Sequence, residues 1–288
     1  MKFKLDGVVA ATDFSEEAGK AVRRAALLAL QHGASLELLH VVSQSSLDAV
    51  RRWVRTPADV ADRLVEDSRR LLQDCAAATG APAKVRLAVG NVVEEILADC
   101  ARGRILVVGA RGLNPLRDAI LGTTAERLVG RCECSILLVR RPPREPYGQV
   151  LAAVDLLPGS ENVLAAAAGI APNAKLAAVH AYDVPFEGAL QRAGVQAQEI
   201  DRHRAAAFHD ALGAIRGLSE QVSGDPERFV PIVEREDARL VLQHERRLGA
   251  DLVVMGKRRQ SKAEALLLGS VSRHVLASAG CDVLVAPA

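Results

Sequence analysis

Aromatic residues are scarce in this sequence: among 288 residues there are one Trp, two Tyr and five Phe. The hydrophobic share is nevertheless 49%, so we expect cores built from Ala, Val and Leu, as in proteins that pack helices closely onto sheets. No apolar run approaches the roughly 18 residues of a membrane-spanning helix, and the start of the chain has no apolar segment of signal-peptide length. We therefore expect a soluble, cytoplasmic protein with no membrane partner.

A large excess of charge of one sign is also missing. The chain has 37 basic and 35 acidic residues and a formal net charge of +2, whereas nucleic-acid-binding proteins usually carry a strong basic excess. We therefore expect no nucleic-acid partner. The cysteines form an odd set without metal-ligand spacing, so we predict no metal site and interpret them as reduced, small apolar residues, with a redox role as the alternative. They are Cys75, Cys100, Cys132, Cys134 and Cys281.

The chain repeats itself. Gly256 lies 147 residues after Gly109, and Cys281 lies the same 147 residues after Cys134. A repeat of this length predicts two copies of one domain. The matching pairs are GVVAATD (7–13) with QVLAAVD (149–155), SLELLHVV (35–42) with KLAAVHAY (175–182), RILVVGARG (104–112) with DLVVMGKRR (251–259), and CSILLVR (134–140) with CDVLVAP (281–287).

A proline-bearing join separates the two copies. The segment RRPPREPYG at 140–148 holds three prolines, which lack the N–H group that helices and sheet ladders require. We therefore predict a first domain at 1–141, a linker at 142–148 and a second domain at 149–288. Because the linker is short and stiff, we expect the two copies to lie close together.

The first copy alternates apolar runs with helical patterns. Nearly continuous apolar runs indicate strands that are buried on both faces, and alternation of strands with helices indicates a parallel sheet covered on both sides. We predict an α/β fold with two tandem, open, parallel five-stranded sheets that have helices on both faces, in the Rossmann-like class. The predicted strands of the first copy are 7–12, 35–42, 84–89, 104–109 and 135–140.

Capping residues mark the ends of the predicted helices. Ser15 is placed to begin the first helix and Gly33 to end it, and Asn91 is placed to begin another. A further predicted helix lies between the helix that ends at Gly33 and the helix that begins at Asn91, and it should end at Gly80. Its predicted buried face consists of Val60, Leu64, Leu71 and Cys75.

A glycine-rich loop follows the fourth predicted strand. Gly109 and Gly112 have no side chains, so their N–H groups can approach an anion and their backbone can adopt positive φ. Gly122, Thr123 and Thr124 open a further helix, whose N-terminus favours negative charge. The segment between them lets the chain leave and return, which predicts a phosphate-sized cup. The spacing matches neither the P-loop nor the dinucleotide fingerprint, and two ordinary turns flanking a loop are the alternative.

This loop carries a family resemblance. The pattern Gly109-x2-Gly112-x9-Gly122-Thr123 resembles the ATP-binding signature of the universal stress protein family. The runs ATDFS, LHVV and CSILLVR resemble the first, second and closing strands of that family. The resemblance covers nearly all of both copies and implies a tandem universal stress protein with an adenine nucleotide α-hydrolase-like fold.

The resemblance also implies a ligand, which is ATP, with Mg²⁺ as a companion ion, or another adenine nucleotide. Asp13 would accept hydrogen bonds from the ribose, three residues would line the adenine slot, and Arg111 would be a charge partner of the phosphates. The alternatives are that Asp13 is a helix N-cap or a first-turn acid, and that Thr124 merely caps its helix. The implied contact residues are Ala11, Thr12, Asp13 and Val41 for the nucleoside, and Gly109, Arg111, Gly112, Gly122, Thr123 and Thr124 for the phosphates.

The second copy departs from the signature. Arg259 replaces the second glycine, and a long side chain there would obstruct the backbone and disfavour positive φ. The run KRR at 257–259 is left to attract phosphate only through its side chains. We therefore predict one nucleotide per chain, bound in the first domain, and a degenerate second site. That second site would consist of Asp155, Gly256, Gly269 and Ser270.

These observations lead to a functional hypothesis. The chain is interpreted as an ATP-binding stress-response and signalling protein in which the first domain is a nucleotide-occupancy switch. The second domain would be its intramolecular partner, with the two closing strands packed against each other, and would offer a surface to an unknown protein partner; a homodimer stays open. A slow ATP hydrolase or nucleotidyl transferase is one alternative, although no general base beyond Asp13 supports an enzyme. A nucleotide-free, small-ligand-binding scaffold is another.

Overall fold

The structure is a computed structural model that describes residues 4–53, 57–98, 104–111, 122–184, 186–235, 239–257 and 269–287. The strands of the first half are β1 (Gly7–Ala11), β2 (Ser35–Ser43), β3 (Ala83–Gly90), β4 (Arg104–Gly109) and β5 (Ser135–Val139). Those of the second half are β6 (Gln149–Ala153), β7 (Lys175–Tyr182), β8 (Phe229–Arg235), β9 (Leu252–Lys257) and β10 (Asp282–Pro287). All five strands predicted in the first half are present.

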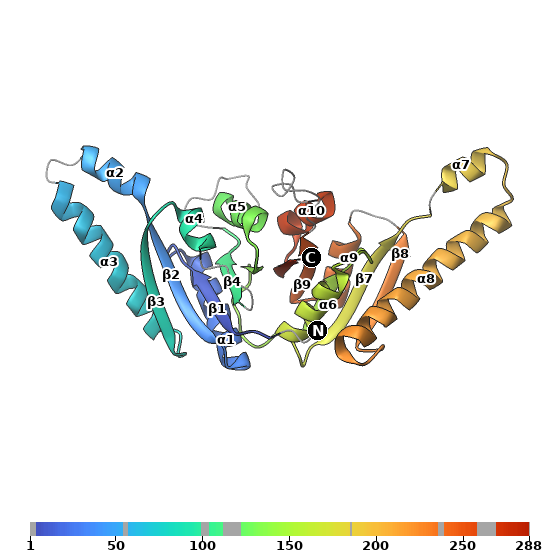
Figure 1. Cartoon of the computed structure of the whole chain (residues 1–288), viewed down its shortest axis with the longest axis horizontal. Helices are drawn as coiled ribbons and strands as arrows, with labels where there is room; N and C mark the ends of the chain where they lie inside the picture. The colour runs from blue at the N-terminus through green and yellow to red at the C-terminus, as the bar shows by residue number, and fades with distance from the viewer. Residues whose placement is uncertain are drawn as a thin grey trace.

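The described strands form one ten-stranded sheet, in the order β3-β2-β1-β4-β5-β10-β9-β6-β7-β8. Every neighbouring pair within a half is parallel, and the two halves meet where β5 and β10 pair antiparallel. The prediction of two parallel five-stranded sheets is therefore confirmed for each half, and the predicted contact between the closing strands joins the halves edge to edge. In Figure 1 the result is a wide, open V with the join at its centre.

Ten helices are described. The predicted caps are present at α1, where the Ser15 hydroxyl accepts the N–H of Ala18 and Gly33 ends the helix with φ 61°. Asn91 caps α4 as predicted. The helices of the first half are α1 (Glu16–His32), α2 (Gln44–Trp53), α3 (Pro57–Ala77), α4 (Val92–Leu97) and α5 (Thr123–Arg131). Those of the second half are α6 (Ser160–Ile170), α7 (Glu187–Arg192), α8 (Ala197–Ser223), α9 (Leu240–Leu248) and α10 (Ser270–Ser278).

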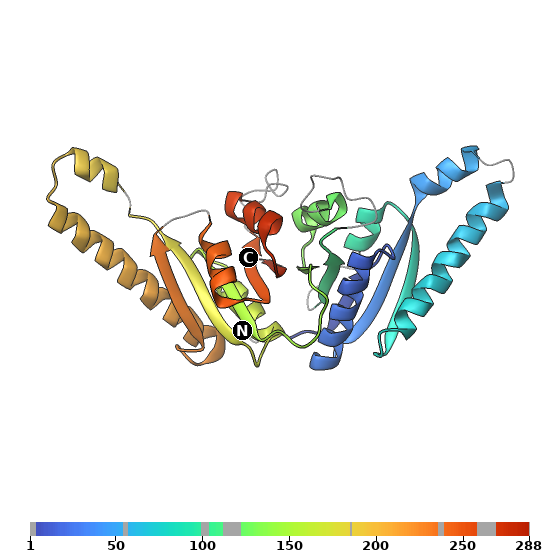
Figure 2. The same cartoon turned by 180° about the vertical axis from the view of Figure 1, so that it is seen from behind.

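Each face of the sheet carries its own hydrophobic core. One core packs the sheet against α1, α3, α6 and α8, and the other packs it against α4, α5, α9 and α10. Equivalent helices therefore occupy equivalent places in the two halves, as the two views in Figure 1 and Figure 2 show. Small side chains such as Ala21 and Ala25 of α1 are fully buried, which lets the helix lie close to the sheet without aromatic residues.

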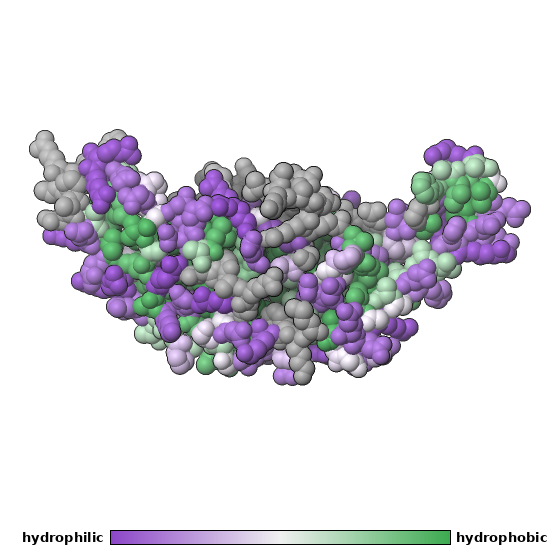
Figure 3. All heavy atoms as spheres, in the orientation of Figure 1, coloured by the Kyte–Doolittle hydropathy of each residue, from purple (hydrophilic) through white to green (hydrophobic). Residues whose placement is uncertain are grey.

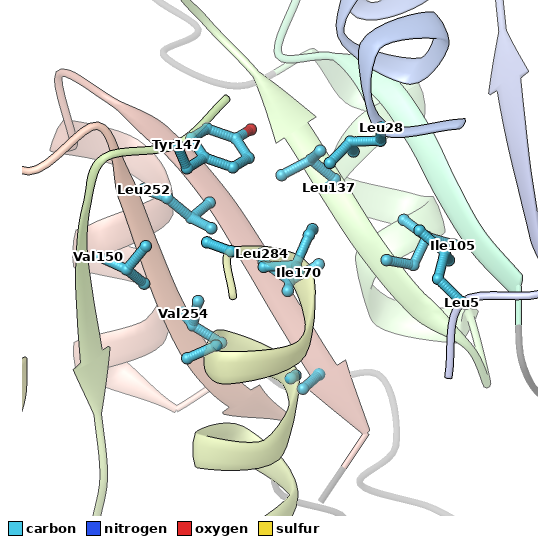
Figure 4. Close-up of a cluster of buried hydrophobic side chains, with 14 of the residues drawn as sticks. Leu5, Leu28, Ile105, Leu137, Tyr147, Val150, Ile170, Leu252, Val254 and Leu284 are labelled. Atoms are coloured by element: carbon cyan, nitrogen blue, oxygen red, sulfur yellow. The ribbon is translucent and has the colours of Figure 1, made fainter. Parts of the chain in front are cut away.

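The cores are continuous across the join between the halves. Leu137 of β5 pairs in register with Leu284 of β10, and both are completely buried. Figure 4 shows Leu28 of α1 next to Leu137, with Leu284 on the neighbouring strand and Tyr147 of the linker segment beside them. Because one cluster contains residues of both halves, the join is an extension of the core rather than a surface contact.

A buried carboxylate anchors the linker at this join. Asp282, the first residue of β10, is 1% exposed and accepts the N–H groups of Arg140 at 2.8 Å and Arg141 at 3.2 Å. The Tyr147 hydroxyl donates to it at 2.7 Å, and burial together with the Asp282 charge raises the pKa of Tyr147, so this donor keeps its proton. Arg24 of α1 neutralises the carboxylate at 3.4 Å and lies over the Tyr147 ring at 4.0 Å.

The predicted buried face of α3 is partly wrong. Leu64 and Leu71 are 41% and 49% exposed, whereas Ala61 and Leu72 are buried. Leu72 follows Leu71 by one residue, which is a rotation of about 100° around a helix, and Ala61 lies on the same side of the helix as Leu72. The reason is the position of α3 at the outer edge of the sheet, beside β3 (Figure 1), where only a narrow strip of the helix meets the core. The hydropathy surface in Figure 3 shows hydrophobic atoms exposed around α3 and β3.

The end of β4 lies very close to the first turn of α1. A Cβ atom built on Gly109 would lie 3.0 Å from the backbone carbon and oxygen of Glu17, and 3.0 Å from the backbone oxygen of Arg111. Backbone atoms cannot move aside as a side-chain tip can, so the glycine at this position is required by packing. Positive φ is not the reason: the described glycines with positive φ include Gly33 and Gly80 but not Gly109. The expectation of positive φ at Gly109 is therefore wrong.

We predict that Asp282→Ala lowers the free energy of unfolding by about 3–5 kcal/mol, because it leaves the buried Arg24 without its charge partner. The matched change Tyr147→Phe removes a single hydrogen bond to the same carboxylate and should cost about 1.5–3 kcal/mol. Urea unfolding followed by circular dichroism measures both. A cost for Asp282→Ala no larger than that for Tyr147→Phe would contradict the central role of the carboxylate.

We also predict that Gly109→Ala lowers the free energy of unfolding by about 1–3 kcal/mol, since the new methyl group must push α1 away from β4. Gly213 of α8 is the control: it is exposed, with no neighbour within 4 Å of an added Cβ. Gly213→Ala should stabilise the protein by about 0.5–1 kcal/mol through helix propensity. Thermal and urea unfolding compare the two variants, and equal effects in both would rule out the packing argument.

Candidate functional site

The strand order places the candidate site. In each half the order reverses beside the first strand: β1 lies between β2 and β4, and β6 lies between β7 and β9. Ligands of open α/β sheets bind in the crevice at the carboxyl ends of the strands at such a point. Ala11 ends β1, Thr12 and Asp13 follow it, and Gly109 is the last residue of β4, so the structure brings these predicted residues to the carboxyl ends of two neighbouring strands, where such a crevice is expected.

Asp13 shapes the turn between β1 and α1. Its Oδ1 atom accepts the N–H of Ser15 at 3.0 Å, and Phe14 adopts φ 63° between them. The helix cap is Ser15 and not Asp13, so the alternative that Asp13 caps α1 is wrong. The turn holds the half-buried carboxylate of Asp13 at the mouth of the crevice.

The turn is braced from β2. His40 donates from Nδ1 to the backbone oxygen of Thr12 at 2.7 Å, and its ring stacks on Phe14 with 4.3 Å between ring centroids. The Thr12 hydroxyl accepts the N–H of Phe14 at 3.0 Å. His180 makes the equivalent contact with the backbone oxygen of Val154 at 3.0 Å in the second half. Both histidines therefore hold the first strand in place, a role that the sequence did not predict in detail.

Two of the three predicted adenine-lining residues share one face of the sheet. Val41 of β2 is buried in the core that also contains α4 and α5, and Ala11 packs against the same core. Thr12 is buried as well. Ala11 and Val41 give this face an apolar surface near Asp13, which suits a flat aromatic ring. Their contact with adenine stays a prediction.

The two ends of the glycine-rich loop are tied together. Gly122 donates its N–H to the backbone oxygen of Ala110 at 2.9 Å, and Ala110 donates its own to Val139 at 3.0 Å. The loop thus returns to the end of β4, as the cup hypothesis requires. Residues 112–121 lie outside the described residues, and with them Gly112.

The N-terminus of α5 faces this crevice without a side-chain cap. Its N-cap residue is Gly122, with φ −66° and no side-chain hydrogen bond. The helix begins at Thr123, directly after this N-cap, so the alternative that Thr124 caps the helix is wrong. Thr123 and Thr124 are both exposed. Backbone N–H groups and two hydroxyls at a helix N-terminus are donors that suit an anion.

Arg111 is exposed at the end of the described part of the loop. Burial is the main cause that lowers the pKa of the Arg140 guanidinium, and repulsion from the charge of Arg111 lowers it further. Positive charge therefore lies close to the predicted phosphate cup. Direct contact between Arg111 and a phosphate stays a prediction.

The second crevice has the same frame with different chemistry. Leu156 repeats the left-handed turn with φ 58°, and Asp155 Oδ1 accepts the Leu157 N–H at 3.0 Å. The same oxygen also accepts the Ser160 hydroxyl at 3.0 Å, which ties Asp155 to the first residue of α6. Gly269 is the N-cap of α10 without a side-chain bond and Ser270 begins that helix.

Lys257 contacts the first half of the chain. Its ammonium group is buried and donates to the backbone oxygen of Gly130, with the oxygen of Cys132 at 3.5 Å, both in the first half. The expectation that the run at 257–259 attracts phosphate through its side chains is therefore wrong for Lys257, and Arg259 lies outside the described residues. A lysine at the end of the apolar run DLVVMGK was the available signal for a buried, paired cation.

The described cysteines fit the reduced, apolar interpretation. Cys132 and Cys134 are buried with 3.3 Å between their sulfur atoms. Burial is the main cause that raises the pKa of the Cys75 and Cys281 thiols, which keeps them protonated and unreactive. Cys100 lies outside the described residues. In the described ranges no cluster of three or more His, Cys, Asp and Glu side chains is arranged to hold a metal ion.

An open hollow of about 590 Å³ lies next to the second crevice. The loop after β6 and the helix α8 line it, mainly with apolar side chains, and none of the predicted second-site residues contributes to it. Its lining residues are Leu156, Leu157, Pro158, Glu161, Ala214, Gly217, Leu218 and Gln221.

Among the helices that the structure describes, none combines the length and apolar character needed to cross a bilayer.

The chain is similar to several known proteins. A universal stress protein of Mycolicibacterium smegmatis is 26% identical over 303 residues, covering 97% of this chain and 96% of the relative. A crystal structure of a universal stress protein from Archaeoglobus fulgidus matches 99% of this chain and 97% of that chain with a TM-score of 0.69 and 17% identity, which shows a shared fold. A universal stress protein solved in complex with cAMP covers 47% of this chain and 97% of that chain, with 28% identity and a TM-score of 0.36.

The family itself is shown by the sequence of both halves. The model of the universal stress protein family matches residues 5–140 and again residues 146–287. The two matches together span nearly the whole chain. This chain belongs to the universal stress protein family and carries the family's domain twice.

Proposed function

We propose that the first domain binds ATP or another adenine nucleotide at the carboxyl ends of β1 and β4. The observation that carries the proposal is the closed loop: the Gly122 N–H bond to Ala110 brings the uncapped N-terminus of α5 to the crevice that holds Asp13. The donors gathered there are backbone N–H groups and threonine hydroxyls, and they fit a phosphate chain. Asp13 offers a carboxylate to the ribose, and Ala11 with Val41 offers an apolar wall to the base.

We further propose that the nucleotide acts as a signal rather than as a substrate. The first domain shares two continuous cores with the second, so a ligand that rigidifies one can change the other. ATP would bring its own Mg²⁺, which typically keeps several waters and binds mainly through the phosphates. Turnover of ATP at a rate above background would instead favour the slow hydrolase or transferase alternative, and a full chain that binds no nucleotide would favour the scaffold.

The site and its stoichiometry are tested with one pair of variants. We expect one ATP per chain in equilibrium dialysis, and Gly112→Val should raise the Kd by roughly a hundredfold, because a side chain in the cup removes about two hydrogen bonds to charged oxygens. The matched change Arg259→Val stands 147 residues later and should leave both numbers unchanged. Circular dichroism checks that both variants fold. Two equivalent sites, or equal effects of the two variants, would refute the assignment.

Coupling between the domains is tested by hydrogen exchange on the full chain. ATP at a hundredfold excess over its Kd should stabilise the folded state by about 2.7 kcal/mol. If the domains form one cooperative unit, part of the added protection should appear in α9 and α10 of the second domain. Protection confined to the first domain would show that occupancy is not transmitted.

A further inference from the structure

The second domain reaches into the first through one buried cation. Lys257, the last residue of β9, is 8% exposed. Its ammonium group donates to the backbone oxygen of Gly130 and lies 3.5 Å from that of Cys132. Cys132 is the C-cap residue of α5. The charge of one domain therefore lies at the C-terminus of a helix in the other.

The physical effect of this placement is well defined. The last carbonyl groups of a helix lack partners within the helix, and together they carry a partial negative charge that a cation stabilises. Burial weakens screening by solvent and salt, so a cation here acts more strongly than one on the surface. A lysine is costly to bury without partners, and the carbonyl oxygens of Gly130 and Cys132 are among the partners of Lys257.

The contact is an asymmetry between the two repeats. The position equivalent to Lys257 in the first repeat, 147 residues earlier, is Ala110, whose side chain cannot make the reverse contact. The first domain instead caps α10 from another position: the Arg140 guanidinium donates to the backbone oxygen of Leu276. Arg141 donates to the oxygen of Gly280 at 2.5 Å, just beyond α10. The second domain thus places a cation at the end of α5, and the first domain places cations at and just beyond the end of α10. Each of these helices precedes the closing strand of its own domain.

The two ends of α5 serve different tasks. The helix has nine residues, so its N-terminus lies roughly 13 Å from the capped end. A cation at the C-terminus and a phosphate at the N-terminus each interact favourably with the dipole of the same helix. The bond to Lys257 also fixes α5 relative to β9, and in Figure 1 α5 and α10 flank the centre of the molecule.

We propose that Lys257 is a positioning residue for the nucleotide site of the first domain. It holds the phosphate-binding helix α5 from its far end, so a residue beside the altered glycine motif of the second domain supports the ligand of the first. The proposal rests on the proposed nucleotide function. It assigns the effect to the phosphates, because α5 meets the ligand only through its N-terminus.

The test compares ATP with adenosine on the full chain by calorimetry. Lys257→Met keeps most of the apolar stem and removes the charge, and it should weaken ATP binding by about fivefold to tenfold while the adenosine Kd stays within twofold. Lys257→Arg keeps a cation and should restore much of the ATP affinity. Arg141→Met is the matched control, since it removes a cation–carbonyl bond across the same join without touching α5, and its ATP affinity should equal that of the wild type.

Hydrogen exchange of the nucleotide-free protein gives a second reading. Lys257→Met should speed exchange of the α5 amides, whereas Arg141→Met should not. Equal losses of ATP and adenosine binding would indicate a general loss of fold and overturn the proposal, as would unchanged ATP affinity in Lys257→Met. A wild-type chain that binds no adenine nucleotide would refute the proposed function itself, and unchanged α5 exchange in Lys257→Met would refute the positioning role even where the wild type binds ATP.

Discussion

The antiparallel pairing of β5 with β10 joins the two domains into one sheet, and the rest of the structure depends on it. An isolated five-stranded half would expose a closing strand with unpaired N–H and C=O groups, and such an edge tends to pair with another chain. Joining the two edges satisfies those groups and makes the cores on both faces continuous. The pairing also sets the place of Asp282, whose buried carboxylate gathers the linker backbone, Tyr147 and Arg24 at the start of β10.

This join changes what duplication means for the molecule. Two copies of one domain normally provide two similar sites, yet here the copies differ at the residues that face the ligand crevices. Asp13 and Asp155 build the same turn, and Asp155 accepts the hydroxyl of Ser160 as well. Lys257 is directed across the join to α5. The second domain therefore contributes to the first through shared core and charge, which is consistent with one ligand site supported by two domains.

Much of the fold could be predicted from local patterns because local physics determines it. Nearly continuous apolar runs need burial on both faces and became the strands of parallel sheets, and Ser15, Gly33 and Asn91 begin or end helices through their own backbone and side-chain bonds. The buried face of α3 was predicted less well, since Leu64 and Leu71 are apolar but lie beyond the edge of the core. Helical periodicity shows that a helix is amphipathic, but not how wide a surface is available to cover it.

The candidate site divides along the same line. The sequence by itself determined the repeat, the parallel α/β class, the family and the cluster of residues at the carboxyl ends of β1 and β4, because each follows from the order of residues along the chain. Only the tertiary structure decided that the backbone of Glu17 leaves no room for a side chain at Gly109. It also decided that His40 hydrogen-bonds to Thr12 and that Lys257 bonds to a helix of the other domain. Those roles depend on which surfaces meet after the chain has folded, and residues 127 positions apart, such as Gly130 and Lys257, carry no local signal of their contact.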